Sequence, residues 1–308
     1  MPTLLKVYEQ NKEPFCPLDI FPKWKRVQKQ PKHIENMIRN YFKIAWRNLQ
    51  KNKVYSFLNI LGLATGLAVF MLIMLWVKNE MSYDNFHNDN DRIAEIMTIK
   101  SFKTGEKQTF PAVPPPIATA IQKDLPGVEY AATVSWGDVR QFTSGENSFM
   151  EDGLYVQPSF LKIFSFPLLY GDTETVLTEP HTVLLTQKLA TKYFGNENPV
   201  GKTIIVEQNI EYKITGVLKD VPDNSTMRFN FLMPMKDYVD FAMNGEEKWE
   251  NNNIRAYVKL KPGINRAQFE KEFAGILSRY TNQQEGSSLF LFMINDWYLR
   301  NDFKDGKY

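Results

Sequence analysis

An apolar run near the N-terminus constrains the fold of this chain more than any other feature. From Val54 to Val77, roughly 24 residues follow one another without a charged side chain. At a rise of about 1.5 Å per residue, a helix of that length crosses the hydrocarbon core of a bilayer, which is about 30 Å thick. Within it, Gly62 and Gly66 form a G-x-x-x-G pattern that lets another helix approach closely. The run therefore predicts one transmembrane helix over residues 54–77.

A cleaved signal peptide is the alternative explanation of this run. Its apolar core would be about half as long, and it would end at an A-x-A-like cleavage site. Trp76, Val77 and Lys78 do not provide such a site. A retained helix is therefore the favoured interpretation.

Charge is distributed unevenly on the two sides of the run. Residues 1–53 contain 12 lysines and arginines against 4 aspartates and glutamates, whereas residues 78–308 contain 25 against 31. Because lysine and arginine next to a span are retained in the cytoplasm, we expect a cytoplasmic N-terminus and an exported main domain. The net acidic character of that domain disfavours nucleic-acid binding. The single cysteine, Cys16, precedes the span, so the exported domain must be stabilised by its own core.

Two segments precede the run. Residues 1–36 contain several prolines among lysine-rich polar sequence, which predicts a disordered cytoplasmic extension. In residues 37–53, Arg39, Lys43 and Arg47 recur at every fourth position, opposite an apolar face. This spacing predicts an amphipathic helix on the cytoplasmic membrane surface. A compatible alternative is that these cations only set the topology.

The sequence after the span predicts an α+β fold. Residues 78–138 and residues 254–308 each contain one strand–helix–strand unit, and residues 139–253 between them contain many short strands with brief helices. Because the units bracket this stretch, we expect them to pair into one α/β lobe with an inserted β-rich lobe. The elements predicted in the units are strands over 93–100, 128–136, 254–260 and 289–294 and helices over 115–125 and 267–280, the last capped by Asn265. Those predicted between the units are helices over 158–164 and 186–194, a hairpin of 202–207 with 211–219, and a strand over 228–233.

No motif in the sequence predicts catalysis or cofactor binding. The segment from Gly195 to Thr203 comes nearest to a phosphate loop, but it has five residues between its glycines instead of four and includes a proline. It also follows a predicted helix and precedes a predicted strand, so we expect a turn. The three histidines, His33, His87 and His181, lack the spacing of zinc ligands.

One cluster of polar residues leaves two interpretations open. His87 lies near Asp84, Asp89 and Asp91, which could bind a cation or form a solvated turn. The turn is favoured because the spacing of a calcium loop is absent. A glycosylation pattern at residues 224–226 is treated as incidental. We therefore assign no catalytic, cofactor-binding or metal residues, and no cofactor.

Several stretches of the sequence together resemble the MacB/FtsX-like permease subunits of ABC transporters, in the version with a MacB-like periplasmic core domain. They cover most of residues 37–233 in the order of the family. The stretches are YFKIAWRNLQKNKVYSFLNILGLATGLA, SYDNFHNDNDRIAEI, FMEDGLYVQPSFLKIFSFPLLYGD, TVLLTQKLATKYFGNENPVGKTI and YKITGVLKDVPDNSTMRFNFL.

The resemblance implies a cell inner membrane protein whose first transmembrane helix leads into a two-lobed periplasmic domain with a porter-like α/β lobe. It also implies that the chain is not an enzyme, because a separate cytoplasmic ABC ATPase subunit hydrolyses ATP. The permease would transmit that movement mechanically to lipoprotein, peptide or drug cargo, as in efflux. Its expected partners are the ATPase, a second permease copy or missing transmembrane helices, the membrane, and a periplasmic adaptor or lipoprotein.

The sequence departs from the family in two respects. Family permeases continue with three further spans near the C-terminus, so the chain resembles a truncated N-terminal part. The family also begins at Met37, so residues 1–36 resemble an added segment. The alternative function is a single-pass membrane sensor or adaptor with a periplasmic binding domain, although 53 cytoplasmic residues are few for an output module.

Overall fold

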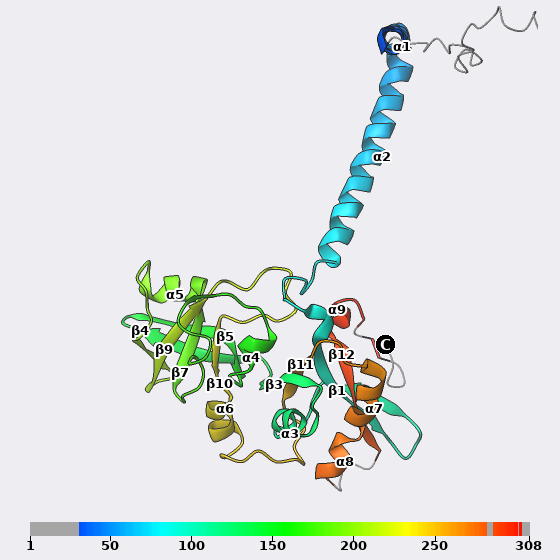
Figure 1. Cartoon of the computed structure of the whole chain (residues 1–308). Helices are drawn as coiled ribbons and strands as arrows, with labels where there is room; N and C mark the ends of the chain where they lie inside the picture. Colours follow the sequence, from blue (N-terminus) through cyan, green and yellow to red (C-terminus); the bar gives the residue numbers. More distant parts are fainter. Residues whose placement is uncertain (1–30, 282–285, 301, 304–308) are drawn as a thin grey trace, which may run out of the picture. The chain divides into compact units, whose positions relative to one another are not determined.

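The structure is a computed structural model that describes residues 31–281, 286–300, 302 and 303. Most of the extension predicted over residues 1–36 lies outside the described residues. The chain divides into two compact units, one up to Met71 and one from Leu72 onwards, and each is described by itself. Figure 1 shows the succession of elements along the chain.

Two helices, α1 (Pro31–Lys51) and α2 (Lys53–Glu80), begin the described chain. α2 contains the predicted span, and among the described residues it is the one helix long and apolar enough to cross a membrane. α1 starts at Pro31, six residues before the expected Met37. Proline suits a first helical position because the amide hydrogen it lacks would be unpaired there anyway. The predicted extension is therefore helical over residues 31–36.

The second unit is built on a sheet of twelve strands. The strands are β1 (Ile93–Ser101), β2 (Lys107–Phe110), β3 (Val128–Val134), β4 (Asp138–Ser144), β5 (Asn147–Val156), β6 (Leu168–Tyr170), β7 (Thr182–Thr186), β8 (Thr203–Val206), β9 (Ile210–Leu218), β10 (Phe231–Pro234), β11 (Arg255–Leu260) and β12 (Ser287–Met293). The helices are the short η1 (Asn90–Arg92), α3 (Ile117–Asp124), α4 (Phe160–Ile163), α5 (Gln187–Phe194), α6 (Met235–Ala242), α7 (Arg266–Ala274), α8 (Ile276–Tyr280) and α9 (Ile294–Trp297).

The first and last strands of this unit form one antiparallel group in the order β3-β11-β1-β12. Each strand–helix–strand unit is thus split by a strand of the other unit, as in a split βαβ arrangement. The pairing of β1 with β12 is the longest, from Ala94 opposite Met293 to Lys100 opposite Ser287. The predicted pairing of the two units across the intervening residues is therefore confirmed.

Side chains of these strands alternate between two apolar clusters. In β1, Ala94 and Ile96 belong to one cluster, while Ile93 and Met97 belong to the other. The first cluster also contains Phe273 of α7, which is fully buried. Since successive side chains of a strand point to opposite faces, both faces of this part of the sheet are covered.

Six strands of the intervening stretch close into a barrel. β4 pairs with β5 and β8, β8 with β9, β9 with β7, and β7 with β10, and β10 then returns to β5 in a parallel pairing. Closure needs a close approach at Gly153, where a Cβ would lie 2.4 Å from the ring of Phe231. Helices α5 and α6 lie at opposite ends of this barrel (Figure 1). β3 continues the sheet from β5, with Val134 opposite Val156.

The C-terminal helical segment differs from its prediction. A single helix is expected over residues 267–280, but α7 ends at Ala274 and α8 begins at Ile276. Gly275 lies between them, and glycine weakens a helix interior by about 1 kcal/mol relative to alanine. The predicted cap is confirmed, since the Asn265 side chain accepts a hydrogen bond from the Gln268 amide at 3.2 Å.

Candidate functional site: the collar after α2

The segment after α2 is held against the main domain by contacts with three distant parts of the chain. We call this arrangement the collar. It consists of residues 82–87 together with Ser165, residues 224–226 and Tyr298, all of which belong to the second unit. The turn itself starts where the Ser82 amide donates to the Asn79 carbonyl at 3.0 Å.

Asp84 is the most densely bonded residue of the collar. Its backbone is left-handed, with φ of 56°, and only 2% of its surface is exposed. Its amide donates to the Asn224 carbonyl at 2.9 Å, and its carboxylate accepts from the Thr226 amide at 2.9 Å and from the Thr226 hydroxyl. Aspartate suits this place because it tolerates the left-handed region and can accept two hydrogen bonds.

The side chain of Asn224 completes this contact from the opposite direction. Its Nδ2 donates to the Ser82 carbonyl at 2.8 Å and to the Ser82 hydroxyl at 3.1 Å. Residues 224–226, whose glycosylation pattern is incidental in the sequence, belong to the collar through Asn224 and Thr226. Only the turn-forming Pro222 and Asp223 before them could have indicated a loop at this position.

His87 fixes the other side of the collar. Its Nδ1 accepts a hydrogen bond from the Ser165 amide at 3.1 Å, and its ring packs against those of Phe86, Phe164 and Phe166. Burial lowers the pKa of His87 to about 4. The imidazole is therefore a neutral hydrogen-bond acceptor inside an aromatic cluster.

Tyr83 joins the collar to the C-terminal part of the domain. Its ring stacks on that of Tyr298, with centroids 3.6 Å apart and planes 7° from parallel. Hydrogen bonds with Tyr83 and Glu80 raise the pKa of Tyr298 to about 12. Tyr298 directly follows α9, whose Trp297 indole donates to the Phe292 carbonyl at 2.9 Å. The chain that leaves α2 is thus stacked against the chain that follows β12.

The structure does not bring the suggested cation ligands together. Asp84 bonds to Thr226, His87 to Ser165, and Asp89 forms ion pairs with Arg92 at 2.6 Å and Lys259 at 2.9 Å. Hydrogen bonds from Lys259 and Arg92 lower the pKa of Asp89. In the part of the chain that the structure describes, no three histidine, cysteine or acidic side chains form a group that could hold a metal ion. The interpretation of this segment as a turn fits these contacts better than a cation site.

The segment from Gly195 to Thr203 forms the expected turn. Gly195 caps α5 with φ of 64°, Lys202 pairs with Glu197, and Thr203 begins β8. His181 lies before β7, away from the collar, and the side chain of His33 lies outside the described residues.

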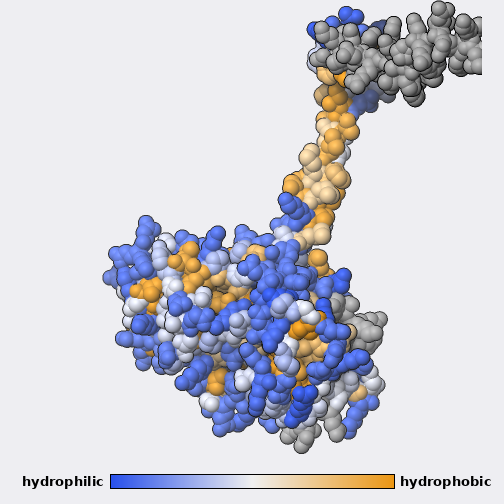
Figure 2. Space-filling view, in the orientation of Figure 1, coloured by the Kyte–Doolittle hydropathy of each residue, from blue (hydrophilic) through white to orange (hydrophobic). Residues whose placement is uncertain are grey.

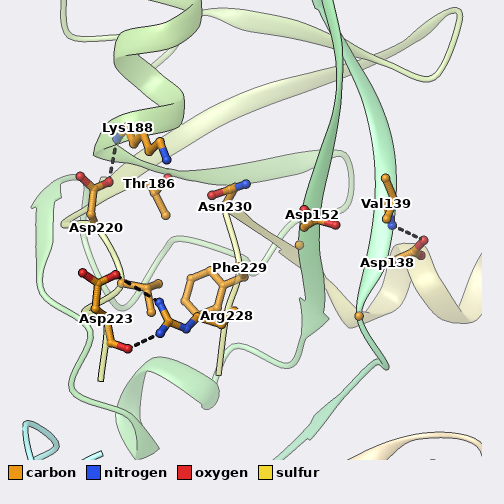
Figure 3. A pocket seen from close by; sticks show the side chains of 13 residues that line it. Asp138, Val139, Asp152, Thr186, Lys188, Asp220, Asp223, Arg228, Phe229 and Asn230 are labelled. Carbon is orange, nitrogen blue, oxygen red and sulfur yellow. Dashed lines mark hydrogen bonds and ion pairs between the residues drawn. The ribbon is translucent and has the colours of Figure 1, made fainter. Parts of the chain in front are cut away.

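A groove of about 600 Å³ lies on the barrel, beside the loop that leads into β10 (Figure 3). It is rich in carboxylates, but several of them accept hydrogen bonds from the chain itself. Asp220 accepts from the Lys188 amide at 2.7 Å, Asp138 accepts from the Val139 amide at 2.9 Å, and Asp223 pairs with Arg228. These interactions stabilise the loops around the groove.

Replacing His87 by phenylalanine is expected to reduce the pH dependence of stability. The unfolded chain, with a histidine pKa of about 6.5, binds more protons than the folded chain, in which it is about 4. The native protein should therefore lose up to about 3 kcal/mol as the pH falls through this window. Urea unfolding of the detergent-solubilised chain at about pH 7 and about pH 4.5 measures the difference. Equal pH slopes for the variant and the native chain would contradict the burial of a neutral imidazole.

Comparison with known proteins identifies the domain. The sequence profile of the MacB-like periplasmic core domain matches residues 56–276. No curated protein matches the chain. Among solved structures, a domain of a protein described as a permease from Porphyromonas gingivalis is 25% identical, with a TM-score of 0.57, and the match covers 66% of this chain and 90% of that one.

Two further solved structures are similar at lower identity. The periplasmic region of MacB from Actinobacillus actinomycetemcomitans is 16% identical, with a TM-score of 0.48 over 68% of this chain and 94% of that one. The extracellular domain of the ABC-type transporter YknZ from Gram-positive bacteria is 14% identical, with a TM-score of 0.48 over 64% and 99%. Because the family profile matches well over half of its residues, the chain belongs to the MacB/FtsX-like permeases, the ABC transporter permeases that carry a MacB-like periplasmic core domain.

Proposed function

We propose that the chain works as a permease subunit that couples ATP hydrolysis by a separate cytoplasmic ABC ATPase to the movement of cargo in the periplasm. The observation that carries this proposal is the collar. Residues 82–84 follow α2 after a single turn and are hydrogen-bonded to Asn224 and Thr226. A displacement of the end of α2 would therefore act directly on the loop that leads into β10.

α2 would act as the transmembrane element, with the N-terminus in the cytoplasm. Its surface is almost entirely apolar (Figure 2), and its length is sufficient to cross a membrane. A Cβ atom added at Gly62 or Gly66 would meet no other atom within 4 Å. Since small residues allow helices to pack closely in membranes, this face suits a second permease copy or further transmembrane helices.

α1 would lie along the cytoplasmic membrane surface. Arg39, Lys43 and Arg47 project from it at helical spacing, and the apolar residues Ile38 and Phe42 are exposed. A helix with such faces can bind an anionic leaflet through both charge and apolar burial. We assign the contact with the ATPase to α1, because α1 precedes the span and therefore belongs to the predicted cytoplasmic side.

The exported domain would work as two lobes. One is the porter-like group of β1, β3, β11 and β12 (residues 78–138 and 254–308), and the other is the barrel within residues 139–253. The sheet passes between them through β3 and β5, where Ser135 and Tyr155 exchange hydrogen bonds of 2.9 Å. Movement of one lobe against the other at this strand pair would act on lipoprotein, peptide or drug cargo, or on a periplasmic adaptor.

Charge reversal on α1 is expected to uncouple the chain from its ATPase. In the triple variant Arg39→Glu, Lys43→Glu and Arg47→Glu, repulsion from anionic lipid and loss of cationic contacts should reduce ATPase co-purification about tenfold or more. The ATPase is identified in the purified complex by mass spectrometry of its phosphate-loop peptide. The matched control reverses Lys103, Lys123 and Lys271 in the exported domain and should leave co-purification unchanged.

Two results would count against this assignment. Unchanged association of the α1 variant would remove the helix from coupling. The second result has two parts: no ATPase accompanies the native chain in any membrane extract, and an added periplasmic ligand changes the conformation of α1. In that case the sensor or adaptor alternative is the better description.

A further inference from the structure

One end of the barrel contains a second cavity, which the collar and the groove of Figure 3 do not involve. The strand registers bring the start of β4, the ends of β5 and β8 and the starts of β7 and β9 to this end, where α6 follows β10. The cavity has a volume of about 400 Å³. The mouth of a β-barrel is a common place for small-ligand sites.

Aromatic rings form much of the wall of this mouth. Tyr155 is buried, and its ring lies 5.5 Å from that of Phe241, between centroids. On the other side, Tyr212 lies 5.5 Å from His181. Phe241 is half exposed, so the part of its ring that the Arg140 guanidinium does not cover is available to a molecule that enters the cavity.

Negative charge predominates among the polar groups of the mouth. Glu207, Asp237 and Asp240 line it, against the single guanidinium of Arg140. Arg140 is already engaged, because its Nη2 donates to Asp138 at 2.7 Å and its Nη1 donates to Glu207 at 3.5 Å. Its guanidinium also lies 4.3 Å from the centroid of the Phe241 ring. The charge of Arg140 is therefore neutralised inside the mouth, and Arg140 is poorly placed to attract an anionic ligand.

Asp237 is a buried carboxylate in this mouth and is held by neutral donors. It is 5% exposed, both of its oxygens accept from the His181 amide, at 3.2 and 3.1 Å, and the Tyr212 hydroxyl also hydrogen-bonds to it. Burial raises the pKa of Asp237, which means that its carboxylate form is disfavoured by its surroundings. A positive group in the cavity would relieve that penalty. Asp240, exposed one helical turn later, provides a second carboxylate at the entrance.

We propose that the α6 mouth of the barrel binds an organic cation, an ammonium group carried on a short hydrocarbon stem. The exposed part of the Phe241 ring and the ring of Tyr212 would receive the cation, because a positive group is attracted to the face of an aromatic ring. Asp237 and Asp240 would supply the opposite charge. This site belongs to the barrel alone and does not depend on coupling to an ATPase.

The same chemistry could come from a free small amine or from a lysine side chain of a protein. Calorimetry on the full chain in a non-ionic maltoside detergent distinguishes these sources. Choline is compared with its neutral isostere 3,3-dimethylbutan-1-ol, and the capped tripeptide Ala-Lys-Ala with capped Ala-norleucine-Ala. We expect one or both cations to bind at least about tenfold more tightly than the matched neutral molecule. Preference for choline points to a small amine, and preference for the peptide points to a lysine side chain.

Substitutions of residues in this mouth test whether the cation binds there. Asp240→Asn and Phe241→Leu change exposed side chains, and each should weaken cation binding about three- to tenfold. Asp223→Asn, in the groove of Figure 3, is the matched control and should bind as the native chain does. Equal affinity for the charged and neutral molecules, no heat of binding for either cation at millimolar concentration, or native affinity in both mouth variants would each overturn the proposal.

Discussion

Replacing Asp84 by alanine is expected to release the collar from the domain while α2 remains helical. The variant loses the carboxylate that accepts from the Thr226 amide and hydroxyl and, at 3.4 Å, from the buried Ser225 hydroxyl. Leaving the buried Ser225 hydroxyl unsatisfied costs about 1–3 kcal/mol, and the left-handed backbone adds strain for alanine. A fall of about 3 kcal/mol in the free energy of unfolding is expected, together with faster amide exchange in residues 81–92 and 222–228.

Asp84→Asn is the matched control for this result. Asparagine tolerates the same left-handed backbone and keeps one carbonyl oxygen for the Thr226 amide, so it should lose about half as much stability or less. Urea unfolding and hydrogen exchange by mass spectrometry measure both variants. If amide exchange in the collar of the alanine variant stays at the native rate, Asp84 does not hold the segment and the proposed route from α2 to the domain is wrong.

Gly153→Ala is expected to destabilise the barrel at the parallel pairing of β5 with β10. The added methyl group would lie 2.4 Å from the ring of Phe231, which is fully buried and packed 4.8 Å from Phe142, between centroids. The ring cannot withdraw without displacing the core, so overpacking should lower the free energy of unfolding by about 3 kcal/mol. Thermal unfolding of the variant measures the loss, and a shift of several degrees is expected.

The second substitution Phe231→Leu tests the cause of this loss. By itself it should destabilise the barrel by leaving a cavity, but it also removes the ring that the new methyl group meets. The double variant should therefore lose less free energy of unfolding than the sum of the two single losses. The difference, which is the coupling energy, should be about 1 kcal/mol or more. Simple additivity would show that the cost at position 153 comes from somewhere other than this ring.

The elements with regular patterns were predictable. The uncharged run gives α2, and the apolar and β-branched alternation gives β1, β3, β11 and β12, whose pairing follows from their order around the intervening residues. No comparable pattern in the sequence predicts that the barrel closes. Closure joins residues 153–156 to residues 231–234, and it depends on a glycine whose missing side chain makes room for one ring. Periodicity does not report a contact between two segments that lie so far apart in the sequence.

The candidate site was predictable only in part. The sequence places a polar turn after α2, but the partners of that turn lie 78 and 142 residues away, at Ser165 and Asn224. Nothing local distinguishes Asn224 from any other loop asparagine. The break at Gly275 and the short elements β2 and α6 escaped prediction because amphipathic spacing continues through the glycine and the other two are only four and eight residues long.

The stacked pair of Tyr83 and Tyr298 has a consequence for how such proteins could have evolved. With ring centroids 3.6 Å apart, the segment that follows α2 and the segment that follows α9 touch each other. A module whose two ends are adjacent can be placed in the turn between two neighbouring helices without altering their spacing, because packed helices are themselves only about 8–10 Å apart. The tyrosine pair would then mark the insertion point at which a helical bundle can gain, lose or exchange an inserted domain while the packing of its own helices stays the same.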